Sequence, residues 1–249
     1  MNSVLKEAIG LLMLLYLCSP TLHSQTFNPK FQFGAGAGTL IYQGDLTPSA
    51  VGSYRTARPV INILATKFLN RFFSVRGNLA LGGLNGDDSK YDKPEYRQQR
   101  NFNFRSPVAE ASVLGEWNIL GGNYIARGFA PYIFGGIGYS FLNIQRDWSR
   151  LNAEYFSAES TLMSGLAEDA QHSLPRGLVV LPVGLGARYY LSDKFGISAE
   201  SSYRIQSSDY LDGFSRAANP SRKDSYYTHS IGIVYRVGKK NTLDCPAVP

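Results

Sequence analysis

The sequence predicts an all-β protein: an eight-stranded antiparallel transmembrane β-barrel of the outer-membrane type, preceded by a signal peptide. Apolar and polar residues alternate with a period of two over eight segments. The segments have 10–13 residues, which is enough for the 9–11 residues that a tilted membrane strand needs. The links between segments are alternately long and short, and no stretch has the roughly 18–20 continuous apolar residues of a membrane helix. An even number of strands can close into a barrel without a free edge.

The N-terminus indicates a signal peptide over residues 1–24. Lys6 precedes the apolar run Ala8–Cys18, which is too short to span a membrane. Cleavage after Ser24 would leave residues 25–249 as the barrel domain. A lipoprotein site at the cysteine of that run is the alternative, but the leucine before it stands where a small residue is required.

The strand segments are placed by their two faces. In the third segment the apolar residues at 73, 75, 79 and 81 alternate with polar or small residues at 74, 76, 78 and 80. The seventh and eighth segments alternate in the same way, with aromatic residues near their ends, which is typical of an interfacial girdle. The predicted strands are Phe31–Tyr42, Arg58–Lys67, Phe73–Gly83, Val108–Trp117, Pro131–Leu142, Val179–Leu191, Phe195–Gln206 and Tyr226–Val237.

The links between the strands predict the orientation of the barrel. Long loops on one side and short turns on the other are typical of bacterial outer-membrane barrels, with the short turns in the periplasm. Both termini, including the C-terminal tail 238–249, then lie on the periplasmic side. The long links are Gln43–Ala57, Leu84–Pro107, Asn143–Leu178 and Ser207–Ser225, and the shorter ones are Phe68–Phe72, Asn118–Ala130 and Ser192–Lys194.

The inward faces predict a charged lumen. An eight-stranded barrel is only wide enough inside for its own side chains, and buried charges are tolerated there when they are paired. We therefore expect an ionic plug and no open channel, with a proton or ion path as the alternative. The plug would consist of four cations and three anions, namely Arg76, Glu110, Glu116, Arg188, Glu200, Arg204 and Arg236.

Composition limits the kinds of partner and ligand that we expect for this protein. The net charge is +6, but the basic residues are scattered and no aromatic platform accompanies them, so no nucleic acid is expected. Cys245 is the single cysteine left after processing, which excludes a disulfide within the chain. No His/Cys/Asp spacing is typical of a metal site, and we expect no metal, cofactor or small-molecule substrate. Outer-membrane lipids are the expected surroundings.

Two motifs with possible chemistry have simpler structural interpretations. Gly34-x-Gly36-x-Gly38 does not open a helix after a strand, so it is not a nucleotide-binding loop, and glycines in barrel strands relieve crowding. His172 lies near Asp169 in the chain, but no positioned nucleophile, base and orienting group come together. No catalytic residue is predicted, and a solvated loop is expected around this histidine.

Charged groups in the long links are also expected to be solvated. The acidic pairs Asp87-Asp88 and Asp209-x-x-Asp212 lack the ligand spacing of an EF-hand, and Asx turns or helix caps explain them. Three arginines of the second long link could meet lipopolysaccharide phosphates, although a solvated loop is the expected state. They are Arg97, Arg100 and Arg105.

Several stretches resemble PorG, a family of outer-membrane barrels of the Bacteroidetes that is associated with type IX secretion. The most specific are Gly44-Asp45-Leu46 and the run Asp209, Tyr210, Leu211 and Asp212. The segment Glu159–Gln171 departs from the family pattern. The other matching stretches are Gly34–Gln43, Arg58-Pro59, Ser74–Arg76, Gly86–Asp88, Arg100–Glu110, Ala130–Tyr139, Leu181–Tyr189 and the final strand.

The resemblance implies a scaffold. Barrels of this family are thought to anchor a periplasmic ring formed by a lipoprotein and its partner. The contacts on this chain would be the short turns and the tail, in which Lys239, Lys240 and Cys245 are candidates. The alternative is a general small barrel of the OmpA or OmpW kind, for envelope integrity or for passage of apolar solutes. The inward arginine and glutamate residues argue against an apolar passage.

Overall fold

Eight long strands make up most of the computed structural model, which describes residues 27–49, 51–157, 160–219 and 223–240. The predicted signal peptide and Cys245 lie outside the described residues, as do the side chains of Lys239 and Lys240. The long strands are β1 (Phe27–Gln43), β2 (Arg58–Phe68), β3 (Phe73–Asp87), β4 (Asn103–Asn118), β5 (Gly128–Leu142), β7 (Gly177–Tyr190), β8 (Phe195–Ile205) and β9 (Ser225–Lys240).

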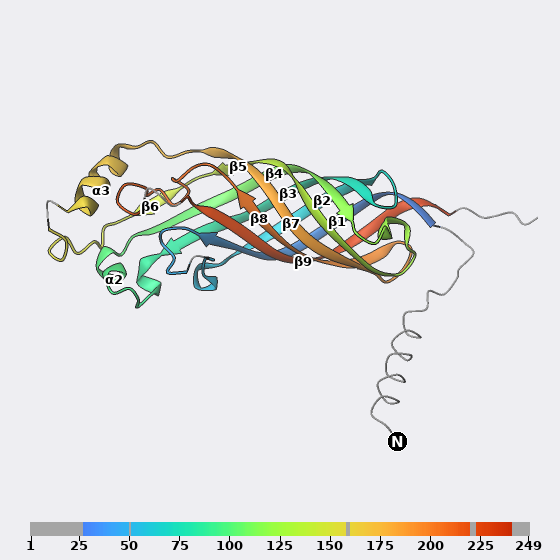
Figure 1. The fold of residues 1–249 in the computed structure, drawn as a ribbon, viewed down its shortest axis with the longest axis horizontal. Coiled ribbons are helices and arrows are strands. Elements are labelled where there is room, and N and C mark those ends of the chain that lie inside the picture. The colour runs from blue at the N-terminus through green and yellow to red at the C-terminus, as the bar shows by residue number, and fades with distance from the viewer. Residues whose placement is uncertain (1–26, 50, 158–159, 220–222, 241–249) are drawn as a thin grey trace, which may run out of the picture. The chain divides into compact units, whose positions relative to one another are not determined.

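The strands close into one barrel (Figure 1). Neighbouring strands follow the order β3-β2-β1-β9-β8-β7-β5-β4, and β3 also pairs with β4, which removes both edges of the sheet. The pairings of successive long strands from β1 to β9 are antiparallel. A Cβ added to Gly38 would lie 1.9 Å from the His229 carbonyl oxygen, so glycine is required where β1 meets β9. The predicted fold class is confirmed.

The hairpin of β3 and β4 is longer than the sequence predicts. Antiparallel pairing continues beyond Gly83↔Pro107 to Asp87↔Asn103, so much of the predicted long link is strand. A Cβ on Gly86 would lie 2.6 Å from the Phe104 ring, and this glycine lets the ring pack across the pair. Arg105 consequently lies on the exposed face of β4 and not in a loop.

The long links contain short elements that alternation does not predict. Strand β6 (Gln145–Asp147) pairs with β4, and helix α3 (Thr161–Gln171) follows it. Ser160 caps α3 by accepting from the Met163 amide. Among the described residues, no helix is both long and apolar enough to cross a membrane. The long links also contain η1 (Tyr54–Thr56), η2 (Asp88–Lys90) and α2 (Tyr96–Arg100), and the shorter link Asn118–Ala130 contains η3 (Gly122–Tyr124).

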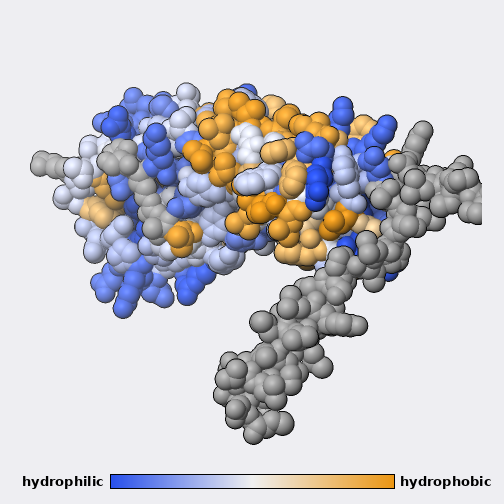
Figure 2. Space-filling model, turned by 45° about the vertical axis from the view of Figure 1, so that its right-hand side comes forward, coloured by the Kyte–Doolittle hydropathy of each residue, from blue (hydrophilic) through white to orange (hydrophobic). Residues whose placement is uncertain are grey.

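A hydrophobic belt surrounds the strands. The outward residues of every long strand include large apolar side chains that are more than one third exposed, such as Ile61, Val113 and Ile231. In Figure 2 hydrophobic residues gather over the strands, while the end with the long loops is largely hydrophilic. An apolar band of this kind on a closed barrel matches a bilayer, because a soluble protein rarely exposes so large a patch.

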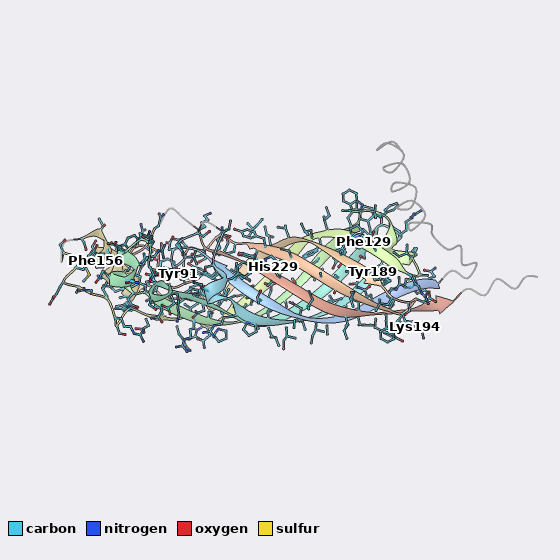
Figure 3. All side chains as sticks on the ribbon, turned by 90° about the horizontal axis from the view of Figure 1, so that it is seen from below. Tyr91, Phe129, Phe156, Tyr189, Lys194 and His229 are labelled. Carbon is cyan, nitrogen blue, oxygen red and sulfur yellow. The ribbon has the colours of Figure 1, made fainter. Side chains whose placement is uncertain are left out.

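The two ends of the barrel differ. The long loops, with α2, α3 and β6, gather at one end, and β1 begins and β9 ends at the other, together with the short links (Figure 1). Figure 3 places Phe129, Tyr189 and Lys194 toward the short-turn end and Phe156 at the loop end. The main apolar core lies at the loop end, where Leu46, Phe102 and other loop residues pack on the strand ends nearest the long loops. We call this packed end the loop cap.

Candidate functional site

A first charged network lies in the lumen between β3, β4, β7 and β8. Glu116 is fully buried and forms ion pairs with Arg188 at 2.7 Å and with Arg76 at 3.1 Å. Arg76 also pairs with Glu200 at 2.6 Å, and Tyr132 donates a hydrogen bond to the same carboxylate. The buried charges are therefore neutralised within hydrogen-bond distance, which a low-dielectric lumen requires.

A second network lies nearer the loop cap. Arg204 contacts Glu110, with 3.1 Å between Nε and Oε2. The same carboxylate accepts from the Tyr226 hydroxyl at 2.9 Å, and Arg204 also donates to Thr228 Oγ1 at 2.6 Å. The void between the two networks has a volume of about 10 Å³. That is about the space of a single water molecule, so side chains fill the lumen at this level.

Arg236 does not join either network. It lies at the short-turn end, where it donates to the carbonyl oxygens of Ile125 at 2.7 Å and Asp193 at 2.9 Å. Its guanidinium carbon lies 3.6 Å from the centre of the Tyr190 ring. The structure thus brings six of the seven predicted lumen residues into two networks with three cations and three anions, and Arg236 ties two short turns together instead.

The first resemblance motif is buried in the loop cap. Leu46 is part of the apolar core, and Asp45 accepts from the Asn219 amide at 2.8 Å. A Cβ on Gly44 would lie 1.9 Å from the Tyr42 hydroxyl oxygen and 2.0 Å from Asp224 Oδ1, so no other residue fits there. Gly44 therefore leaves the space in which the Tyr42 hydroxyl and the Asp224 carboxyl group meet, and the sequence alone does not reveal that role.

The second resemblance motif lies against the first. The Tyr42 hydroxyl oxygen is 2.6 Å from Asp212 Oδ2, although 170 residues separate them. Leu211 is fully buried in the core, and Asp209 accepts from the Ser215 hydroxyl at 2.5 Å. Tyr42 and Asp224 were not predicted as site residues, because no local pattern marks a contact across such a distance.

The loop arginines are buried, which makes the expected solvated loop wrong for two of them. Asp88 pairs with Arg97 at 2.8 Å and with Arg100 at 2.6 Å. These arginines also donate to the carbonyl oxygens of Thr47 and Asp45, and so fasten the first long loop to the second. Such charge-assisted bonds hold loops in one arrangement. Asp87 caps η2 by accepting from the Ser89 amide, as an Asx turn would.

The segment that departs from the family pattern contains helix α3, which has a structural role. The Asp169 carboxylate accepts from the amides of Ser215, Arg216 and Ala217 at 2.9–3.1 Å and holds that loop against the helix. His172 stacks on Tyr210 with 3.9 Å between ring centres. Among the described residues, this ring contact brings no serine, threonine or cysteine to the imidazole of His172. Among the same residues, no group of three or more His, Cys, Asp or Glu side chains could hold a metal ion.

The short-turn end forms a rim, here defined as residues 69–72, 119–127 and 191–194. The Asn123 side chain donates to the Asn70 carbonyl at 2.8 Å and so joins the first two turns. Apolar side chains project from them, among which Leu69 is 56% and Leu120 is 61% exposed. The charged residues of the rim are Arg71, Arg127, Lys194 and Asp193. The rim is thus held together by hydrogen bonds between its turns, apolar at its tips and basic overall.

Comparison with known proteins identifies no family. No protein-family model matches the chain, and no curated protein matches it. Solved structures share the fold weakly: Ail of Yersinia pestis is 12% identical with a TM-score of 0.46, covering 84% of this chain and 99% of its own. OprG of Pseudomonas aeruginosa is 11% identical with a TM-score of 0.46, covering 86% and 99%. Neisserial surface protein A is 14% identical with a TM-score of 0.43, covering 84% and 97%. Likeness at this level says nothing of what this chain binds.

Proposed function

We propose that this protein is an outer-membrane β-barrel of the type IX secretion machinery that anchors periplasmic ring proteins through its short-turn rim. The observation that carries the proposal is the rim itself, because hydrogen bonds join its turns and it still exposes apolar side chains beyond the strands. An exposed apolar patch on an ordered surface is typical of a contact with a partner. The resemblance of the two buried motifs to the secretion family suggests which partners these are.

The filled lumen supports a contact role over transport. Four arginine–glutamate ion pairs cross the lumen, and the void between the two networks is only about 10 Å³, which favours a filled barrel over an open channel. The loop cap adds a packed apolar core over the other end. A barrel filled in this way acts through the surfaces that it presents at its two ends.

The test is recovery of ring proteins with variants of the rim. Deleting the whole turn 118–130 would also remove the Ile125 carbonyl that binds Arg236, so point substitutions are cleaner. We expect the pair Leu69→Ser and Leu120→Ser to reduce co-purification of the ring lipoprotein and its partner at least tenfold. Removal of the tail 241–249 is expected to weaken recovery further.

The matched control is Val51→Ser, which changes an apolar residue that is 69% exposed on the loop side. Its recovery of ring proteins should equal that of the unaltered protein. Equal recovery with the rim variant, at equal barrel abundance in the outer membrane, would contradict anchoring through the rim.

A general small barrel that supports envelope integrity is the second candidate, and the sealed lumen fits it equally well. It differs in one outcome: the rim variants would leave partner recovery unchanged, while loss of the whole protein would still raise sensitivity to detergents. Passage of apolar solutes gains no support, because arginine, glutamate and polar side chains line the lumen.

A further inference from the structure

The loop cap contains two carboxyl groups that meet at one hydroxyl group. Tyr42 Oη lies 2.6 Å from Asp212 Oδ2 and 2.7 Å from Asp224 Oδ1. A tyrosine hydroxyl has one hydrogen and can donate to only one of these oxygens. Both separations are those of O–H···O hydrogen bonds, so the second contact needs a hydrogen on a carboxyl group.

The other oxygens of the pair are already used by backbone amides. Asp224 Oδ2 accepts from the amides of Leu211 and Asp212 at 3.2 and 3.3 Å, and Asp212 Oδ1 accepts from the Phe214 amide at 2.8 Å. A proton added to the pair therefore belongs on an oxygen that faces Tyr42. There it completes the chain of hydrogen bonds from one aspartate through the hydroxyl to the other.

Among the described residues, no cation forms an ion pair with Asp212 or Asp224 that could replace that proton. Both carboxyl groups are almost completely buried, and Asp45 and Asp209 add negative charge beside them. Arg100 acts on Asp212 electrostatically but is already bidentate to Asp88. Arg146 lies farther out in β6 and donates to the Gly213 carbonyl. If both carboxyl groups were ionised, two buried negative charges would face the same Tyr42 hydroxyl group, and they would repel strongly without a compensating cation.

We propose that Asp212 and Asp224 hold one proton between them through Tyr42, and that the loop cap stays closed only while that proton is bound. This proton joins β1, which carries Tyr42, to the last long loop, which carries Asp212 and Asp224. Loss of the proton to solvent leaves two carboxylates facing a single donor. Their repulsion then separates the loop from β1 and opens the cap.

The pKa values of these groups agree with the geometry. Burial raises the pKa of Asp212 to about 8, and burial together with the Asp212 charge raises the pKa of Asp224 well above its ordinary value. For an acid whose pKa is raised on folding, the folded state binds more protons than the unfolded state between the two values. Closure is therefore favoured at low pH and is lost as the pH rises through about 8.

The test is hydrogen exchange of the full barrel in lipid nanodiscs, followed over peptides of residues 206–224. After correction for the intrinsic rate, protection of the unaltered protein should fall by up to about tenfold per pH unit between about pH 4 and pH 8 and level off above, as linkage to one proton requires. Asp224→Asn keeps an acceptor for the two amides and a donor for Tyr42, and should weaken that pH dependence. Because burial still raises the pKa of Asp212 in this variant, only the double variant Asp212→Asn/Asp224→Asn should abolish it. The matched control Glu168→Gln, which changes a largely exposed carboxylate of helix α3, should retain it.

An infrared measurement covers the case in which the variant does not fold. The unaltered protein at pH 6 should show the carbonyl band of a protonated carboxyl group, and this band should disappear at pH 10. A pH-independent exchange of residues 206–224, an unchanged pH dependence in the double variant Asp212→Asn/Asp224→Asn, or absence of the band at pH 6 would each overturn the proposal. None of these readouts depends on the anchoring role proposed above.

Discussion

Glu116→Ala tests whether the lumen charges are desolvated. This carboxylate is fully buried and is shared by Arg76 and Arg188, at 3.1 and 2.7 Å, and it also accepts from the Ser74 hydroxyl at 2.8 Å. Removing one partner of a buried pair strands the other charge and costs about 3–5 kcal/mol. Because two arginines depend on Glu116, we expect a loss of unfolding free energy at the upper end of that range. Arg76 keeps Glu200, which limits the loss.

The assay is reversible unfolding by guanidinium of the barrel in lipid vesicles, with tryptophan fluorescence as the signal. The chain has two tryptophans, and Trp117 lies on the strand that carries Glu116. The matched control is Glu168→Ala, which removes a pair with Arg216 that is largely exposed, at 3.7 Å. An exposed pair contributes less than about 1 kcal/mol. An equally small loss for Glu116→Ala would refute a desolvated lumen.

Three further outcomes follow from the same geometry. Gly44→Ala should lower the free energy of unfolding by at least about 2 kcal/mol and expose the loops to protease, because its Cβ would collide with Tyr42; a wild-type digestion pattern would contradict that packing. Val113→Arg, on the lipid face, should cost about 2–4 kcal/mol in vesicles, and Val51→Arg in the loop should leave stability unchanged. The free energy of unfolding of the barrel should decrease as the pH rises from about 4 to about 8, because burial raises the pKa of Asp212 to about 8. A free energy of unfolding that increases over this range would contradict the prediction.

The strands and the inward charges could be predicted from the sequence because both depend on a period of two. Once a segment is a barrel strand, alternation alone places Arg76 or Glu110 inside. Which charges meet depends on the stagger of the strands around the barrel, and alternation does not contain that information. Arg76 and Glu200 are 124 residues apart, and Arg236 faces the lumen axis yet binds carbonyl groups of the turns.

The loop cap was largely out of reach of sequence reasoning. Asp88 and its two arginines were identified as charged loop residues, but their burial depends on contacts with the first long loop that no local pattern encodes. Helix α3 did carry a signal, because Ser160 stands as an N-cap before apolar residues at 162, 163 and 166. The Tyr42 contacts to two aspartates, 170 and 182 residues away, carried none.

The central claim is that the barrel is sealed and works through its surfaces, and conductance across a planar bilayer tests it most directly. With three paired charges of each sign in the lumen and a packed cap above them, the purified protein should give no stable unitary conductance at neutral pH. A stable, large unitary conductance that disappears when the protein is left out would contradict the filled lumen, and with it the contact role.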